Sequence, residues 1–189
     1  MAVTGKGPLL VYRGRDRNEI RDILATRFDG TTWSPARPVH ADQWKMSACP
    51  VNGPAVAARD DAAFVAWYTE AGGQPLLKLA RSTDAGASFA APVEVDRGAA
   101  LLGRVDVAFD GQQAVLAWLR EDGNGQSLQL ARYNADLSKP LQRLEVARLQ
   151  GRGRGTGFPK LALRDGIAYL AWTDVIDGRP QLRGAMLAR

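Results

Sequence analysis

The sequence predicts an all-β protein built from repeated four-stranded antiparallel sheets, and a repeated motif with a regular spacing leads to this fold class. Three apolar runs end in Ala-Trp, at Trp67, Trp118 and Trp172, and a weaker fourth copy ends in Tyr12. These aromatic residues lie 55, 51 and 54 positions apart. Such a period is typical of the blades of a β-propeller and longer than that of helical solenoids. We therefore predict a β-propeller.

Each repeat contains further strand-like runs in a constant order, so that one blade has strands A to D. Strand A ends at an Asp-Asp or Asp-Gly turn, which favours a hairpin to strand B, the run that ends in the aromatic residue. Strand D contains proline, which suits an outer edge strand. The predicted A strands are 54–58, 105–109 and 159–163; the C strands are 23–27, 77–81 and 128–132; and the D strands are 33–39 and 89–95.

The repeats divide the chain into four blades, and those at both ends are incomplete. Blade 1 (residues 1–47) is predicted to lack strand A, and blade 4 (151–189) to lack strand D, whereas blades 2 (48–98) and 3 (99–150) are complete. We infer a partial, about four-bladed portion of a six-bladed propeller. Its remaining blades would come from the same full-length chain or from a second copy. The alternative is a closed ring of about four blades, near the lower limit for this architecture.

The turn between strands C and D of blade 2 carries a recognisable motif. Its sequence reads Ser-x-Asp-x-Gly-x-x-aromatic, with Ser82, Asp84, Gly86 and Phe89 at the defining positions. Ser and Asp side chains can bond turn backbone, and glycine can adopt a positive φ. The motif resembles the Asp-box of sialidase-like (BNR-repeat) β-propellers. We interpret these four residues as structural, because turns between strands C and D lie away from the channel mouth.

Composition excludes several classes of function. The 189 residues carry a formal net charge of +5, but Lys and Arg are scattered through all four blades with acidic residues among them, which argues against nucleic-acid binding. No apolar segment approaches the ~20 residues of a membrane span, and no signal-peptide pattern is present. Cys49 and His40 are the single cysteine and histidine, so neither a metal site nor a cofactor is expected.

The candidate ligand site lies in the loops that join strands B to C and D to A, because these share the channel mouth. The predicted B-to-C loops are 13–19, 68–74, 120–125 and 173–178, and the D-to-A loops are 40–53, 96–104 and 149–158. Long loops on a rigid scaffold often carry function. The candidate ligand-binding residues are Arg13, Arg15, Arg17, Trp44, Asn52, Arg104, Asp106 and Arg154. Asp106 is also a possible salt-bridge partner of Arg104.

The resemblance to sialidases implies three arginines that hold a substrate carboxylate, a tyrosine nucleophile assisted by a glutamate, and an acid/base aspartate. The Arg-Ile-Pro motif of the first arginine is absent here, and the sequence around Tyr68 and Glu70 differs from that of the enzymes. No catalytic residue can therefore be assigned. Residues 48–54, 102–106 and 157–159 resemble a bacterial group of sialidase-superfamily proteins without an assigned reaction, which implies a periplasmic or secreted location.

Three hypotheses of function follow. The first is a sialidase-like module that binds a carboxylated glycan or another acidic ligand at the channel mouth. The second is a scaffold that binds a protein partner and carries out no small-molecule chemistry. The third is the C-terminal part of an exo-sialidase-type glycosidase whose catalytic residues lie mostly outside this chain. Convergence of the arginines on one point would favour an anion site, and splaying into solvent would favour the scaffold.

Overall fold

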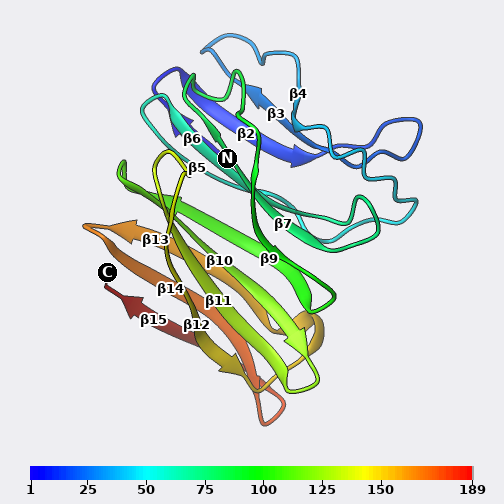
Figure 1. The fold of residues 1–189 in the computed structure, drawn as a ribbon, viewed down its shortest axis with the longest axis vertical. Coiled ribbons are helices and arrows are strands. Elements are labelled where there is room, and N and C mark those ends of the chain that lie inside the picture. Colours follow the sequence, from blue (N-terminus) through cyan, green and yellow to red (C-terminus); the bar gives the residue numbers. More distant parts are fainter. Residues whose placement is uncertain (189) are drawn as a thin grey trace. The chain divides into compact units, whose positions relative to one another are not determined.

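The computed structural model describes residues 1–188, apart from the side chain of Arg154. The chain forms two compact units, one ending at Ala99 and the other beginning at Ala100. Each unit contains two sheets whose antiparallel strands follow one another in sequence order (Figure 1). Within the described residues the only helical segment is one turn of 3-10 helix, η1 (Gly153–Gly155). The all-β fold class is thus confirmed.

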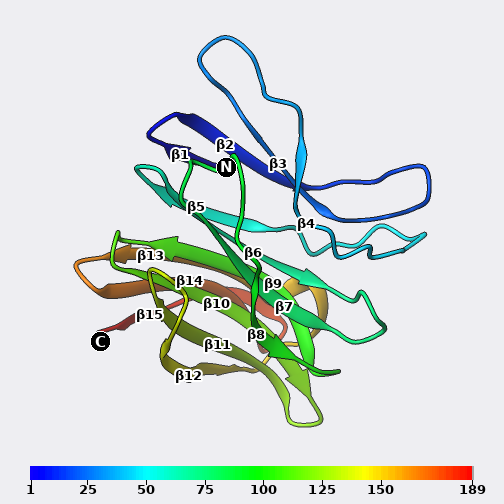
Figure 2. The same cartoon turned by 45° about the horizontal axis from the view of Figure 1, so that its top comes forward.

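Unit 1 contains two four-stranded sheets, which correspond to blades 1 and 2. The first sheet consists of β1 (Ala2–Thr4), β2 (Gly7–Arg13), β3 (Ile23–Arg27) and β4 (Arg37–His40). The second consists of β5 (Ala55–Arg59), β6 (Ala62–Thr69), β7 (Leu76–Ser82) and β8 (Val93–Arg97). The connections between β2 and β3 and between β4 and β5 extend from the same end of the unit, on the right in Figure 2.

Unit 2 contains one sheet of four strands and one of three within the described residues. The four-stranded sheet consists of β9 (Leu101–Phe109), β10 (Gln113–Asp122), β11 (Gly125–Asn134) and β12 (Pro140–Leu149). The three-stranded sheet consists of β13 (Gly157–Arg164), β14 (Ile167–Ile176) and β15 (Arg179–Leu187).

The first sheet has an inner strand that the sequence did not reveal. Blade 1 was expected to lack strand A, but Ala2, Val3 and Thr4 pair with Leu9, Pro8 and Gly7 as strand β1. Three residues are too few to show either an apolar run or an alternating pattern, which explains why the prediction was wrong.

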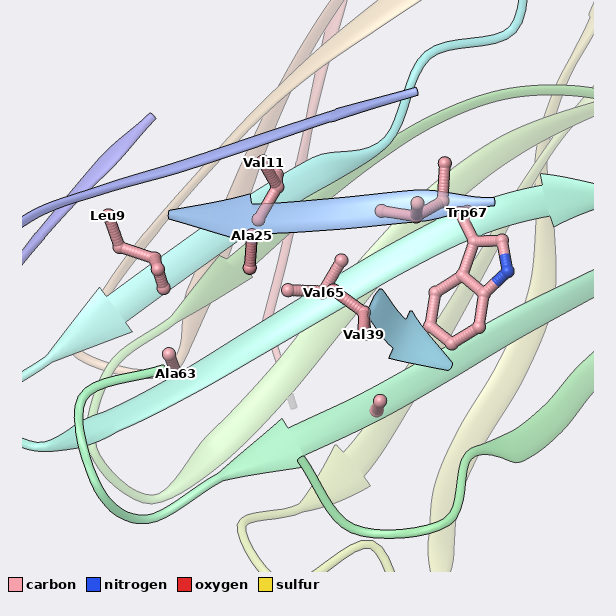
Figure 3. Packing of buried hydrophobic residues seen from close by; sticks show 9 residues of the cluster. Leu9, Val11, Ala25, Val39, Ala63, Val65 and Trp67 are labelled. Atoms are coloured by element: carbon pink, nitrogen blue, oxygen red, sulfur yellow. The ribbon is translucent and has the colours of Figure 1, made fainter. Parts of the chain in front are cut away.

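The core of unit 1 lies between its two sheets. Leu9 and Val11 of β2 alternate with more exposed residues, and they pack with Ala63, Val65 and Trp67 of β6 (Figure 3). Every residue of β6 from Ala63 to Trp67 is fully buried. A strand buried on both faces reads as a continuous apolar run, and this is why the repeat was visible in the sequence.

The three tryptophans of the repeat occupy equivalent positions in their sheets. Trp67, Trp118 and Trp172 are each the sixth residue of the second strand, in β6, β10 and β14. Trp118 is fully buried, and Trp172 belongs to the core of unit 2 together with side chains of β10 and β11. This equivalence confirms the period that defined the blades.

Two of the predicted loops are tight turns instead. Residues 120–125 and 173–178 were expected to form loops between strands B and C, but β10 and β14 continue to Asp122 and Ile176. The second turn consists of Asp177 and Gly178, both with positive φ, which matches the twist of a hairpin. Polar residues before the turn had suggested a loop, but they pair in register as strand.

Residues 1–188 include no helix with the length and apolarity that crossing a bilayer requires.

Replacing Trp67 with alanine should lower the free energy of unfolding by about 3–5 kcal/mol, because a fully buried indole leaves a large cavity. Trp33, which is 48% exposed, is the matched control, and its replacement should cost less than about 1 kcal/mol. Urea denaturation followed by circular dichroism measures both values. Equal losses in the two variants would contradict the assigned core.

Candidate functional site

The candidate site is the end of unit 1 where the β2–β3 connection (14–22) and the β4–β5 connection (41–54) lie against each other. Ile20 and Lys45 form an isolated antiparallel bridge. The amide of Arg21 donates to the carbonyl of Trp44 at 2.8 Å, and the amide of Met46 donates to the carbonyl of Glu19 at 3.0 Å. These bonds give the backbone of both connections partners that a free loop would find only in water. We call this region the loop end of unit 1.

Arg13 is held at the centre of the loop end by backbone carbonyls. Its Nε and Nη2 donate to the carbonyl of Asn52 at 3.1 and 3.0 Å. Nη2 also donates to the carbonyl of Tyr68 at 2.6 Å, and Nη1 donates to that of Arg21 at 2.8 Å. Burial lowers the pKa of Arg13 to about 10. The guanidinium therefore joins the two sheets of unit 1 and has most of its donors occupied.

Trp44 is a packing residue at this end and does not form an exposed platform for a ligand. Its side chain is buried, the Arg13 guanidinium carbon lies 4.8 Å from its ring centroid, and the ring of Tyr68 meets it edge-on at 5.9 Å. Burial raises the pKa of Tyr68. Arg13, Trp44 and Tyr68 thus pack together in one group, and Asn52 joins the group through its backbone carbonyl.

A buried carboxylate that the sequence analysis missed lies in the same region. Asp42 accepts hydrogen bonds from the indole nitrogen of Trp67 at 2.6 Å and from the Lys78 ammonium at 2.5 Å. The Nε2 of His40 lies 3.7 Å from the same carboxylate. The available signal was Lys78, a charged residue at the centre of an apolar strand, because such a residue needs a partner of opposite charge.

Asp22 supports the start of the β4–β5 connection. Its carboxylate accepts hydrogen bonds from the amide of Trp44 and from the Gln43 side chain, both at 3.3 Å. Burial raises the pKa of Asp22 and outweighs the opposing effect of the Trp44 amide. The side chain is a buried acceptor that was not among the predicted site residues.

A pocket of about 230 Å³ opens beside Asp22. We call it the loop-end pocket, and its lining residues come from β2, β3, β4 and the two connections. They are Gly14, Arg15, Asp16, Ile20, Asp22, Leu24, Pro38 and Gln43. The mixture of acidic, basic, amide and apolar groups suits a polar organic ligand.

The remaining arginines predicted in blade 1 lie on the rim of the loop end. Arg15 forms an ion pair with Glu19, which also binds Arg21 at 3.0 Å. Arg17 is exposed and makes no hydrogen bond or ion pair within residues 1–188. The three arginines of blade 1 thus do not converge on one point. Backbone carbonyls bind the guanidinium of Arg13, and Glu19 binds that of Arg15.

The predicted residues in unit 2 have structural partners of their own. Nη1 of Arg104 donates to the carbonyls of Gly153, at 3.0 Å, and Thr156, and the guanidinium lies 4.7 Å from the ring centroid of Phe158. The Asp106 carboxylate accepts the amides of Leu161 at 2.9 Å and Val107 at 3.1 Å. The side chain of Arg154 lies outside the described residues.

The sequence predicted Arg104 in the loop before an inner strand. In the structure, Arg104 lies within strand β9. Gly103 and Arg104 both have positive φ, with values of 76° and 51°. Gly157 and Phe158 repeat this conformation in β13, with values of 81° and 52°. The pairing of each strand is irregular at this position, as expected for a bulge. The bulge turns Arg104 toward the next sheet of its own unit.

The Ser82–Phe89 turn is held by its own side chains. Asp84 accepts a hydrogen bond from the amide of Ser88 at 2.9 Å and further bonds from the hydroxyls of Ser82 and Ser88. Burial opposes the charge of Asp84, but the bonds from Ser88 and Ser82 outweigh it and lower the pKa to about 2. Gly86 has a φ of 81°, and a Cβ there would clash with Leu9 at 2.6 Å. Phe89 packs against the core of unit 1.

Within the residues that the structure describes, no cluster of three or more His, Cys, Asp or Glu side chains could hold a metal ion. Cys49 is exposed and has a free thiol.

Comparison with known proteins shows likeness at the level of the fold. No family model and no curated protein sequence matches the chain. Among solved structures, a GH43 endo-arabinanase from Bacillus licheniformis matches with a TM-score of 0.57 and 14% identity, over 98% of this chain and 70% of that one. A Trypanosoma rangeli sialidase in complex with the inhibitor DANA matches with a TM-score of 0.53 and 13% identity, over 97% of this chain and 35% of that one. Both are β-propeller glycosidases, so the predicted sialidase-like propeller fold is confirmed.

Replacing Arg13 with lysine should lower the free energy of unfolding by about 1.5–3 kcal/mol, since one ammonium group cannot reach three carbonyls in different directions. The exposed Arg17→Lys variant makes the same substitution, which also keeps the positive charge, and should differ from the parent by less than about 0.5 kcal/mol. Both are measured by urea denaturation. If Arg13→Lys were as stable as Arg17→Lys, the carbonyl bonds would have no structural importance.

Replacing Asp84 with alanine should cost about 0.5–2 kcal/mol at neutral pH, as for the loss of a capping side chain. Because the pKa of Asp84 is lowered to about 2 from 3.8, its contribution is complete above about pH 4 and disappears as the pH falls toward 2. The stability difference between parent and variant, measured by thermal unfolding from pH 7 to pH 2, should therefore shrink over that range. A difference that does not change with pH would contradict this assignment.

Proposed function

We propose that this chain is a glycan-binding propeller module, and that an acidic glycan binds at the loop end of unit 1. The loop-end pocket is the observation that carries the proposal. Its volume of about 230 Å³ is below the ~300–1,000 Å³ of sites for drug-sized ligands, so it suits one or two sugar rings of a longer chain. The endo-arabinanase and the sialidase whose folds resemble this chain are glycosidases, which is consistent with a glycan as the ligand.

The polar groups of the pocket match the hydroxyl groups of a sugar. Asp16 uses Oδ1 to accept the amides of Asn18 and Ile20, and its Oδ2 has no bond within residues 1–188. Gln43 uses its Nε2 on Asp22, so its carbonyl oxygen can accept a further bond. Leu24 and Pro38 provide the apolar surface that the C–H face of a sugar ring requires.

Arg17 is the group of the β2–β3 connection that favours an acidic ligand. Residues 14–22 contain three arginines and three carboxylates, so the connection as a whole has no net charge. Arg13 and Arg15 are engaged in bonds within the protein, whereas Arg17 has donors available at the rim. We therefore assign the carboxylate of the glycan to Arg17 and to the outer edge of the Arg15 guanidinium, in place of Arg104.

The test is titration of an oligosaccharide of uronic acids, and of its neutral counterpart, into the parent and the Arg17→Ala variant. Loss of a hydrogen bond to a charged group should weaken binding of the acidic sugar by roughly 10- to 150-fold. Binding of the neutral sugar should change little. Arg164→Ala, which removes an 84% exposed arginine in the β13–β14 hairpin, is the control for the change in net charge.

Backbone NMR spectra identify the place of binding in the same titration. Resonances of Gly14 and Gln43, which line the loop-end pocket, should shift with the acidic sugar. If neither sugar binds, or if Arg17→Ala and Arg164→Ala behave alike, the proposal is wrong, and the loop end is better described as a surface for a protein partner.

A further inference from the structure

A second pocket lies at the opposite end of the strands of unit 1, beside the Ser82–Phe89 turn. We call it the turn-end pocket, and it has a volume of about 190 Å³. Its lining residues come from β3, the segment leading into β4, and the turn itself. They are Ala25, Arg27, Ser34, Pro35, Arg37, Gly86 and Ala87. The lining contains two arginines and no carboxylate.

Arg27 is fixed in the pocket with one edge of its guanidinium unused. Its Nη1 donates to the carbonyls of Asp84 at 3.2 Å and Ala85 at 3.0 Å. Its Nε and Nη2 donate to no group within residues 1–188, and no carboxylate pairs with it. These two nitrogens form the edge that binds both oxygens of a carboxylate in a bidentate pair. Because the side chain is already anchored, binding would cost little conformational entropy.

Arg37 places a second positive charge on the same face of the sheet. It pairs across the strands with Ala25, so Arg27, two residues along β3, is its diagonal neighbour. Diagonal neighbours on one face of an antiparallel pair are about 7–8 Å apart, within reach of long side chains. Arg37 is exposed and forms no ion pair within the described part of the chain. Two neighbouring cations without an acidic partner repel, and an anion bound between them removes that repulsion.

In blade 3 the arginine equivalent to Arg27 has no edge available for a ligand. Arg132 of β11 is equivalent to Arg27, and it is fully buried with donors on Gln142, Gly166 and Leu187. The residue equivalent to Arg37 is Leu144, which packs against the core of unit 2. In blade 2 the equivalent residue is Val93. The second arginine is thus specific to blade 1.

We propose that the turn-end pocket binds the carboxylate of a uronic acid residue, held by the Nε–Nη2 edge of Arg27 and by Arg37. The apolar surface of Ala25 and Pro35 would receive the C–H face of the sugar ring. A single-stranded nucleic acid fits less well, since its backbone needs a continuous basic groove and this pocket offers one pair of cations. This proposal does not depend on binding at the loop end, because the two pockets share no lining residue.

The test uses methyl glucuronide as the probe, with methyl glucoside and acetate as comparisons, and follows backbone NMR shifts of the intact chain. The resonances of Gly86 and Ala87 should move with the glucuronide. Binding should be at least about tenfold weaker for the glucoside, which lacks the carboxylate, and for acetate, which lacks the ring.

Arg37→Leu copies the residue of blade 3 at an exposed site, so the variant is expected to fold. It should weaken glucuronide binding at Gly86 and Ala87 by roughly tenfold or more, while Arg17→Ala should leave these shifts unchanged. Arg27→Lys keeps the charge but removes the bidentate edge, and it should weaken binding to a similar extent.

Three outcomes would overturn the proposal. They are equal binding by Arg37→Leu and the parent, equal binding of acetate and glucuronide, and preferential binding of an oligonucleotide. Shifts confined to Gly14 and Gln43 would also overturn it while supporting the proposed function, so the two failures can be distinguished.

Discussion

Guanidinium groups that donate to backbone carbonyls of the neighbouring sheet are the interaction on which each unit depends. In unit 1, Arg13 binds the carbonyls of Asn52 and Tyr68, and Arg27 binds those of Asp84 and Ala85. In unit 2, Arg104 and Arg132 make the corresponding bonds from the two ends of the first sheet to the second. Apolar packing between sheets has no direction, whereas these bonds fix how one sheet lies on the next.

This arrangement explains why two of the candidate ligand-binding arginines, Arg13 and Arg104, are occupied within the protein. A carbonyl needs no countercharge of its own, so an arginine used in this way leaves the chain basic without creating an anion site. Arg81, the equivalent of Arg27 in β7, departs from this arrangement at one atom, because its Nε is buried without a hydrogen bond in the described residues.

The sequence predicted the fold better than the site, and the reason is physical. Strands buried on both faces, such as β6 and β10, show continuous apolar runs, and their hairpin turns contain Asp-Gly pairs, so period and strand order can be read directly. The partners of Arg13 and Arg104 are carbonyls, which every residue possesses. No residue type marks them, and only the folded backbone brings them within reach.

Differences between equivalent positions of the repeat are a stronger guide to function than residue type alone. An arginine lies at the end of strand C in three blades, and in two of them, as Arg27 and Arg132, it donates to carbonyls of the next sheet. Arg37 has apolar equivalents in Leu144 and Val93, so the fold does not require a charge there. A charge that the repeat does not need, placed beside an arginine with an open edge, costs repulsion in the empty protein. A bound anion would remove that repulsion, and this feature, more than the number of arginines, points to a ligand.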